Sequence, residues 1–337
     1  MKLTVLGPGC WGLTLAWLLT DNFDKITVWG RESDLYEDLI VNKHCSKPLE
    51  VQLDKKIEIT SDLKSAIEDA EIILSVVATV GMRDVCEKLK AAGIKSNQIL
   101  VNASKGIELN SLLRMSEVIK DVLPEQKVAV LSGPTLAKEV LQGKPTAASV
   151  ASEDLEAAEF VQKAMNVGGK FRLYTNSDVI GVELGGSLKN VIAIASGFAN
   201  SMNLGDNCKG SLLTRGMAEI VRLSVKLGAN PSTLYGLSGM GDLIATCSSP
   251  MSRNFTVGSL LGQGKKIDDI LKELGSVAEG VKTSKAVCDL GKKLGVETPV
   301  SSAIYEALYT DITPQEVLDK LMNRKLKEEE KYDKVGR

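Results

Sequence analysis

A glycine-rich turn at residues 7–12 constrains the fold more than any other feature of the chain. The apolar segment Lys2–Leu6 is followed at once by the run GPGCWG, and an apolar helical segment comes next. The pattern G-x-G-x-x-G indicates dinucleotide binding when it joins a strand to a helix. Gly7 permits the tight turn, Gly9 lets the backbone approach a pyrophosphate, and Gly12 lets the helix pack on the strand. We therefore predict a dinucleotide site here rather than an ordinary strand-to-helix turn.

The residues after the second apolar segment, Lys25–Trp29, bear on which dinucleotide is bound. An NAD site usually offers an acid near this point, whereas an arginine accommodates a 2′-phosphate. The chain offers both, as Arg31 and Glu32. Arg31 favours NADP(H), whereas Glu32 is compatible with NAD(H). The alternative is that Arg31 is a solvated loop residue that does not contact the cofactor. The predicted cofactor is accordingly NADP(H), NAD(H) or both.

The first half of the chain alternates short apolar segments with helical ones. This rhythm is typical of β-α-β units, and it predicts an α/β fold with a largely parallel, Rossmann-like doubly wound sheet. The predicted strands are Lys2–Leu6, Lys25–Trp29, Ile57–Thr60, Ile72–Val77, Ile99–Ala103, Val128–Leu131, Ala147–Ala151 and Phe171–Tyr174.

The second half of the chain has the periodicity of helices and contains no convincing strand pattern. Helices are expected near residues 178–200, 208–227, 253–262, 279–294 and 299–310. We expect a dinucleotide-binding domain at residues 1–177 and a helical substrate and catalytic domain at residues 178–337. The charge run at residues 325–334 is expected to be a solvated or frayed end.

Lys189 is the one charged residue between Glu183 and Asp206, inside an apolar helical run. A helix that is apolar nearly all round is expected to be buried. Burial disfavours the charged form of lysine and lowers its pKa toward neutral pH, where it can exchange protons. The alternative is a lysine whose stem lies on apolar surface with its head in water.

The composition of the chain argues against nucleic-acid binding, a metal site and membrane insertion. The net charge of −2 gives no global field that would attract nucleic acid. Six scattered cysteines without paired spacing predict reduced thiols and no metal site. Residues 1–20 lack the features of a signal peptide, and Lys189 interrupts the one apolar stretch that approaches a membrane span. We therefore expect a cytoplasmic protein without membrane insertion.

The chain has a single histidine, His44, set among polar loop residues. Many hydroxy-acid dehydrogenases use a histidine as proton relay because its pKa suits that role. A loop histidine without a catalytic role is the better interpretation of His44, and this favours a lysine as the proton relay.

Candidate substrate residues follow two of the predicted strands, because open α/β sheets bind ligands beyond the carboxyl ends of their strands. Lys105 ends one strand, and Gly133 and Thr135 lie where another leads into a helix. In the helical half, Asp242 precedes an apolar segment and is expected to face a partner charge. The run Ser252-Arg253-Asn254 offers a helix cap, a planar fork suited to phosphate, and an amide.

Together these segments resemble the NAD(P)-dependent glycerol-3-phosphate dehydrogenases of the bacterial type. The matching segments occur in the family's order over nearly the whole chain, with departures at Pro8, Cys10 and Thr135. They are Gly7–Gly12, Ser104–Glu108, Ser132–Glu139, Gly181–Gly197, Gly205–Asn207, Gly239–Asp242, Ser252–Asn254 and Val277–Gly280.

The resemblance implies a helical second domain like that of 6-phosphogluconate dehydrogenase, dimer contacts, and a role in supplying glycerophospholipid synthesis. It implies that Lys189 donates and accepts the proton, with Lys105 and Asp242 as its catalytic partners. The implied substrate residues are Lys105, Gly133, Thr135, Lys189, Asp242, Ser252, Arg253 and Asn254. The implied cofactor contacts are Gly7, Gly9, Cys10, Trp11, Gly12, Arg31, Lys105, Ala137, Arg253, Val277 and Glu279.

The predicted reaction is the reversible reduction of dihydroxyacetone phosphate to sn-glycerol 3-phosphate. Two alternatives stay open from the sequence. One is a related dehydrogenase acting on a 3-hydroxy acid or on 6-phosphogluconate, and the other is an NAD(P)-binding module without catalysis. Retention of Lys105, Lys189 and Asp242 favours catalysis.

Overall fold

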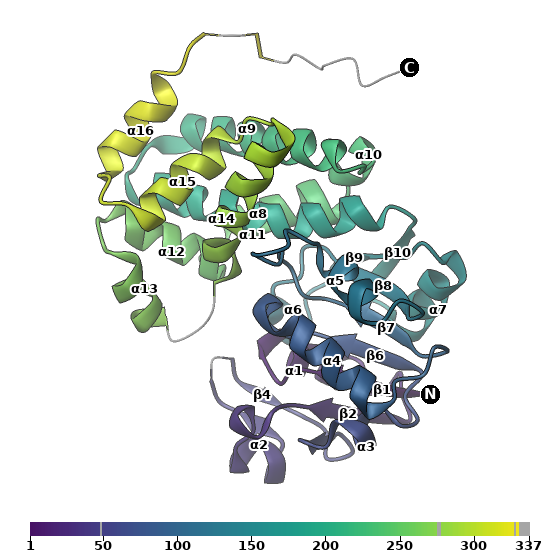
Figure 1. Cartoon of the computed structure of the whole chain (residues 1–337). Helices are drawn as coiled ribbons and strands as arrows, with labels where there is room; N and C mark the ends of the chain where they lie inside the picture. The colour runs from purple at the N-terminus through teal and green to yellow at the C-terminus, as the bar shows by residue number, and fades with distance from the viewer. Residues whose placement is uncertain (48, 275–277, 327, 330–337) are drawn as a thin grey trace.

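The chain folds into a sheet domain and a helical domain that stand one above the other (Figure 1). The structure, a computed structural model, describes residues 1–47, 49–274, 278–326 and 328–329. Purple to blue-green elements, from the first part of the sequence, form the sheet domain. Teal to yellow helices form the second domain, with the last helix farthest from the sheet.

An eight-stranded sheet with the order β10-β9-β8-β7-β6-β1-β2-β5 organises the first domain. Every neighbouring pair is parallel except β8 and β9, which are antiparallel. The strands are β1 (Lys2–Leu6), β2 (Lys25–Trp29), β5 (Glu58–Thr60), β6 (Ile72–Ser75), β7 (Ile99–Asn102), β8 (Lys127–Ser132), β9 (Thr146–Ala151) and β10 (Phe171–Asn176). All eight predicted strands are thus confirmed, and the sheet is largely parallel as expected.

Helices cover both faces of the sheet, as the doubly wound pattern predicts. Side chains alternate along each strand, so Leu3 and Val5 of β1 pack on one face and Leu6 on the other. One face is covered by α1 (Cys10–Leu18), α6 (Ala137–Leu141) and α7 (Leu155–Met165). The other is covered by α3 (Leu63–Ile67), α4 (Met82–Ala92) and α5 (Met115–Val122).

A short excursion between β2 and β5 lies at the edge of the sheet. It contains α2 (Glu37–Val41) and the two-stranded antiparallel pair β3 (His44–Cys45) and β4 (Val51–Gln52). These elements were not predicted, because they are too short to show a periodic pattern. His44 lies in β3, where its Nδ1 is 2.7 Å from Oδ2 of Asp38.

The second domain contains no strand within the residues that the structure describes. Its helices are α8 (Val179–Ser201), α9 (Gly205–Lys226), α10 (Pro231–Leu234), α11 (Asp242–Ser248), α12 (Arg253–Gly262), α13 (Ile267–Leu274), α14 (Glu279–Leu294), α15 (Pro299–Tyr309) and α16 (Pro314–Met322). The five predicted helices are present with ends that agree to within three residues. The shorter α10, α11, α13 and α16 were not predicted.

Helix α8 forms the centre of the helical domain. Asp178 caps its first turn by accepting a hydrogen bond from the Gly181 amide at 2.8 Å. By length and composition α8 could cross a membrane, so the expectation that Lys189 would rule out any such stretch was wrong. However, 94% of the most apolar 18-residue segment of α8 is buried inside the protein, as expected for a core helix.

Glycines bring α8 and α12 unusually close together. A Cβ added to Gly197 of α8 would lie 1.9 Å from the carbonyl oxygen of Phe255. On the partner helix, a Cβ on Gly258 would lie 1.8 Å from the carbonyl oxygen of Ile194. The two backbones therefore touch at the crossing, and this contact fixes α12 against the C-terminal part of α8.

Candidate active site

Two lysines share one buried carboxylate where the two domains meet. Nζ of Lys189, on α8, lies 2.5 Å from Oδ1 of Asp242, and Nζ of Lys105 lies 2.6 Å from Oδ2. The side chains of Lys189 and Asp242 are only 7% and 2% exposed. Lys105 follows β7 of the sheet domain, whereas Asp242 begins α11 of the helical domain. The expectation that Asp242 faces a partner charge is confirmed, because it pairs with both Lys189 and Lys105.

The surroundings of Lys189 lower its pKa to about 8 from the ordinary value of 10.5. Burial is the largest cause, since it penalises the charged ammonium. The positive charge of Lys105 acts in the same direction, while the carboxylate of Asp242 opposes both. The amine can therefore hold or release a proton at a pH not far above neutral.

Thr246 completes the shell around the Lys189 ammonium. Its Oγ1 accepts a hydrogen bond from Nζ at 2.5 Å and donates one to Oδ1 of Asp242 at 3.1 Å. Thr246 comes four residues after Asp242 on α11, so one turn of helix places both on the same face. Thr246 was not among the predicted site residues, although its spacing of four from Asp242 was a signal in the sequence.

The loop after β8 reaches the same cluster from the sheet side. The carbonyl oxygen of Gly133 accepts hydrogen bonds from Nζ of Lys105 at 2.9 Å and from Oγ1 of Thr135 at 3.2 Å. Gly133 has a φ of +159° and abuts β9: a Cβ there would lie 2.8 Å from Cα of Ala148. Ala137 is the first residue of α6, immediately beyond this loop.

A second polar group lies at the start of α12. Ser252 caps this helix by accepting a hydrogen bond from the Phe255 amide at 3.3 Å. The Asn254 side chain is buried and donates to Oδ1 of Asn190, the neighbour of Lys189, at 2.9 Å, and it accepts from the Gly280 amide at 3.0 Å. Asn254 thereby ties α12 to α8 and α14, and Asn190 joins the site although no sequence signal had selected it.

The glycine-rich turn has the shape that a pyrophosphate needs. Gly7 has a φ of +106°, and a Cβ on Gly12 would lie 2.1 Å from the carbonyl oxygen of Gly7. At Gly9 a Cβ would meet nothing within 4 Å, so the backbone is open to a ligand. No side chain caps the start of α1, which leaves its first amide groups free to bind an anion.

Arg253 of the helical domain lies within electrostatic reach of Cys10 in the glycine-rich turn. The Arg253 side chain is exposed at the start of α12. Its positive charge acts on the Cys10 thiol and opposes the burial that raises the pKa of that thiol. Trp11, next to Cys10, is half-buried against the core of the sheet domain. A cation from the helical domain therefore stands near the predicted pyrophosphate loop.

Glu279 and Thr79 form another bridge between the domains. Glu279 is the first residue of α14, and its carboxylate accepts hydrogen bonds from the amide and the hydroxyl of Thr79 at 3.3 and 2.7 Å. Thr79 lies after β6, so Glu279 reaches the same edge of the sheet as Lys105. Val277, a further predicted cofactor contact, lies outside the residues that the structure describes.

Arg31 lies apart from this cluster, just beyond the carboxyl end of β2. Its guanidinium binds Asp34 through two hydrogen bonds of 2.8 Å, from Nε to Oδ2 and from Nη2 to Oδ1. The acid next to Arg31 in sequence, Glu32, is exposed. The carboxylate that Arg31 binds is therefore that of Asp34, which was not among the predicted site residues.

Comparison with known proteins identifies the family. The model for the N-terminal domain of NAD-dependent glycerol-3-phosphate dehydrogenase matches residues 2–158, and the model for its C-terminal domain matches residues 178–319. The chain belongs to this family. It is thus an oxidoreductase that uses NAD(H) or NADP(H), and the resemblance stated from its motifs is confirmed.

Bacterial relatives match along nearly the full length. Glycerol-3-phosphate dehydrogenase [NAD(P)+] of Thermoanaerobacter sp. (strain X514) is 46% identical, covering 98% of this chain and 99% of the relative. The enzyme of Bacillus subtilis (strain 168) is 43% identical, covering 96% and 94%. The solved structure of glycerol-3-phosphate dehydrogenase from Coxiella burnetii superposes with a TM-score of 0.90 at 32% identity, covering 96% of this chain and 99% of that one.

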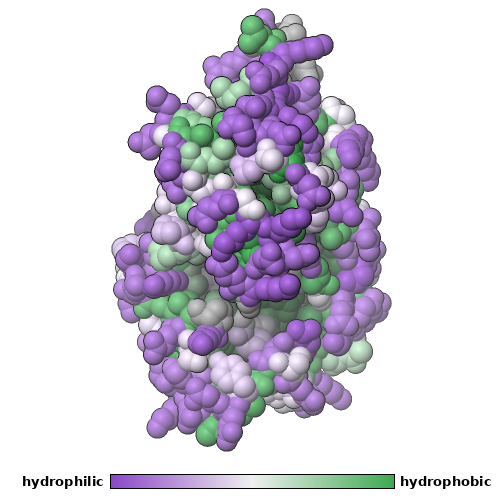
Figure 2. Space-filling view, turned by 90° about the vertical axis from the view of Figure 1, so that its left-hand side faces the viewer, coloured by the Kyte–Doolittle hydropathy of each residue, from purple (hydrophilic) through white to green (hydrophobic). Residues whose placement is uncertain are grey.

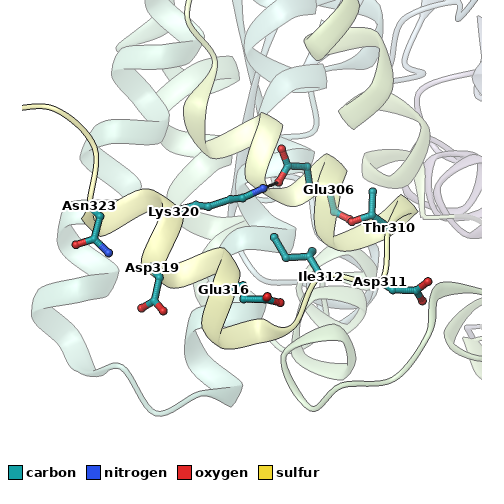
Figure 3. Close-up of a pocket in the computed structure, with 8 residues that line it drawn as sticks. All are labelled: Glu306, Thr310, Asp311, Ile312, Glu316, Asp319, Lys320 and Asn323. Atoms are coloured by element: carbon teal, nitrogen blue, oxygen red, sulfur yellow. Dashed lines mark hydrogen bonds and ion pairs between the residues drawn. The ribbon is translucent and has the colours of Figure 1, made fainter.

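A separate cavity of about 830 Å³ lies between α15 and α16, away from the lysine cluster (Figure 3). Most of its charged lining residues are acidic, and the one lysine, Lys320, is paired with Glu306 at 2.5 Å. None of the predicted site residues lines it.

Over the face drawn in Figure 2, hydrophilic side chains predominate and apolar ones are scattered in small groups. In the lysine cluster, the side chains of Lys189 and Asp242 are 7% and 2% exposed, whereas that of Lys105 is 19% exposed.

Proposed function

We propose that the chain catalyses the reversible, NAD(P)H-dependent reduction of dihydroxyacetone phosphate to sn-glycerol 3-phosphate. The observation that carries this proposal is the buried cluster of Lys189, Asp242 and Lys105 beside the carboxyl ends of the parallel strands. Ligands of open α/β sheets bind at this edge. The relatives are glycerol-3-phosphate dehydrogenases by name, which supports this choice of substrate.

The residues at the glycine-rich turn fit a dinucleotide. Gly7, Gly9 and the open start of α1 would hold the pyrophosphate, and Arg31 would face the adenosine end. Glu279, Ala137 and Arg253 would contact the rest of the cofactor. When bound, the reduced dinucleotide supplies the hydride to the ketone carbon, and the oxidised form takes it back.

Lys189 is the proposed proton donor and acceptor. During reduction its ammonium would donate a hydrogen bond to the ketone oxygen and then pass it a proton as negative charge develops there. During oxidation the neutral amine would accept the proton of the substrate hydroxyl. The pKa of about 8 suits both directions, because neither form of the amine is rare near neutral pH.

Asp242 and Lys105 would hold Lys189 ready for this transfer. Each oxygen of the Asp242 carboxylate binds one lysine, so both ammonium groups are fixed relative to the sheet edge. In a site with little water, such fixed charges act more strongly on a developing alkoxide than they would in bulk solvent. Lys105 would also reach the substrate directly, from a position anchored by the Gly133 carbonyl.

The start of α12 would bind the phosphate of the substrate. Arg253 offers a planar fork that matches phosphate oxygens, and its side chain is exposed and available. Ser252 and Asn254 flank it on the same turn, while Thr135 and Gly133 would line the opposite side. The substrate would thus be held at its phosphate by one domain and at its ketone by Lys189.

We further propose a division of the chain near residues 177 and 178 into a cofactor domain and a substrate domain. The last strand ends at Asn176 and α8 begins at Val179, which supports this boundary. We place the enzyme in the cytoplasm, as a homodimer, where its product would supply glycerophospholipid synthesis. A small phosphorylated substrate is its expected partner.

A direct assay tests the proposed reaction. Initial rates would be measured with dihydroxyacetone phosphate and with NADH and NADPH in parallel, together with carboxylate ketones such as ketopantoate. We expect turnover of dihydroxyacetone phosphate well above that of any carboxylate ketone. A preference for a carboxylate substrate would favour the hydroxy-acid alternative, and cofactor binding without turnover would favour a non-catalytic module.

A further inference from the structure

The contact between Arg31 and Asp34 occupies the fork that a phosphate would use. A guanidinium binds an oxyanion best through two parallel N–H groups. In Arg31 the Nε and Nη2 groups both donate to the Asp34 carboxylate at 2.8 Å. The side of the fork that carries these two groups is therefore taken by an internal anion.

Asp34 is held in place by more than the arginine side chain. Its Oδ2 also accepts a hydrogen bond from the Arg31 backbone amide at 3.2 Å, within the short 3-10 helix Glu32–Asp34. The Asp34 side chain is 30% exposed, whereas that of Arg31 is 64% exposed. The carboxylate is thus the more buried member of the pair and is held by a backbone amide as well, whereas the guanidinium is the more exposed member.

The position of this pair in the fold relates it to the cofactor. Strand β2 lies beside β1 in parallel, and the residues after β2 stand next to the glycine-rich turn. Pro8 of that turn confirms the proximity, since a Cβ on Gly30 would lie 2.8 Å from its Cγ. In doubly wound folds the group that follows this strand meets the adenosine ribose, where NAD and NADP differ.

We propose that Asp34 determines how strongly this enzyme distinguishes NADPH from NADH, by competing with the 2′-phosphate for Arg31. This inference rests on the proposed location of the cofactor. A 2′-phosphate must either draw Arg31 away from Asp34 or bind beside the Asp34 carboxylate, which carries a like charge. Both possibilities lower the affinity of the enzyme for NADPH. A 2′-hydroxyl meets no such cost and can donate a hydrogen bond to the same carboxylate.

Glu32 provides a matched comparison within the same loop. It carries the same charge and follows Arg31 directly, but among the described residues its carboxylate makes no hydrogen bond or ion pair. A general effect of negative charge would appear on removing either acid. Competition for the Arg31 fork would appear only on removing Asp34.

Binding measurements on the full chain test the proposal. The dissociation constants of adenosine 2′,5′-bisphosphate and of AMP would be measured by calorimetry for the wild type, Asp34→Asn and Glu32→Gln. We expect Asp34→Asn to tighten the bisphosphate about fivefold and to leave AMP nearly unchanged. Glu32→Gln should change either constant less than twofold. The ratio of KM values for NADPH and NADH should shift in parallel with the bisphosphate constant.

Three results would overturn the proposal. Weaker bisphosphate binding in Asp34→Asn would mean that Asp34 orients Arg31 for the phosphate. Equal effects of the two substitutions would mean a general charge effect, and no effect of either would mean that the ribose end binds elsewhere. The assay with dihydroxyacetone phosphate reports separately on the proposed reaction, which stands if the wild type turns over whatever Asp34 does.

Discussion

The ammonium of Lys189 and the carboxylate of Asp242 lie 2.5 Å apart, and both side chains are almost completely buried. Burying an ion pair costs desolvation energy that the attraction between the charges barely recovers. The pair is therefore poorly explained as a device for stability. It is better explained by the need to keep a titratable amine at a fixed place beside the sheet edge.

Replacing Lys189 by alanine should remove both the proton relay and the positive charge facing the ketone oxygen. We expect kcat to fall on the order of 10³-fold or more, with smaller changes in the KM of the cofactor. Steady-state kinetics with dihydroxyacetone phosphate would measure the loss. Circular dichroism should show an unchanged fold, and near-normal turnover in a folded variant would disprove the assigned role.

The pKa of Lys189 also predicts opposite pH dependences for the two directions. Ketone reduction needs the protonated amine, so its rate should decline as the pH rises through about 8. Alcohol oxidation needs the neutral amine, so its rate should increase over the same range. Both pH profiles of kcat would be recorded, and a reduction rate that keeps rising from pH 7 to pH 9 would contradict this assignment.

Asp242 supplies a check on that pH dependence. Its carboxylate raises the pKa of Lys189 against the effects of burial and of Lys105. In Asp242→Asn this support is lost, so the decline of the reduction rate should move to lower pH, accompanied by a lower maximum. An unchanged profile would show that the titrating group is not Lys189.

The glycine pattern and the strand periodicity were enough to predict the sheet domain, because each is a local property of the sequence. Lys189 was equally visible, since a lone charge in an apolar run is rare. Thr246 and Asp34 were not found. Their importance comes from contacts with Lys189 and Arg31 that only the folded backbone sets, Thr246 across two helices and Asp34 within a short turn.

The hydrogen bonds between Thr79 and Glu279 also could not be predicted from local sequence, here because the two residues are far apart in the chain. These residues are 200 positions apart in the chain. Glu279 was selected from the family resemblance, but nothing local to Thr79 marks it as a partner. Antiparallel pairing of β8 with β9 was likewise invisible, because strand direction depends on the path of the intervening loop and helix rather than on strand composition.

Arg253 should affect substrate binding more than the chemical step. Its guanidinium is proposed to hold the phosphate, a contact present in both the ground state and the transition state. In Arg253→Ala we expect the KM for dihydroxyacetone phosphate to rise roughly tenfold or more, with a smaller change in kcat. Arg253→Lys, which keeps the charge without the planar fork, should recover part of the loss. An unaltered KM in the alanine variant would remove Arg253 from the phosphate site.

The crossing of α8 and α12 should be intolerant of any side chain at Gly197. A Cβ there would lie 1.9 Å from the carbonyl oxygen of Phe255, so Gly197→Ala must push two backbones apart. We expect the free energy of unfolding to fall by about 2 kcal/mol or more, and the thermal midpoint by about 3 °C or more.

Gly210 is the matched control for this prediction, because it also lies within a long helix, α9, but is exposed, and a Cβ on it would meet nothing within 4 Å. Gly210→Ala should raise the thermal midpoint by about 1 °C, since alanine favours the helix over glycine. Activity should fall in Gly197→Ala even below its melting temperature, because α12 carries Arg253 and Asn254 and its displacement moves both. Equal midpoints for the two variants would mean that α8 and α12 can separate at no cost, and the close glycine contact would then not explain how α12 is held.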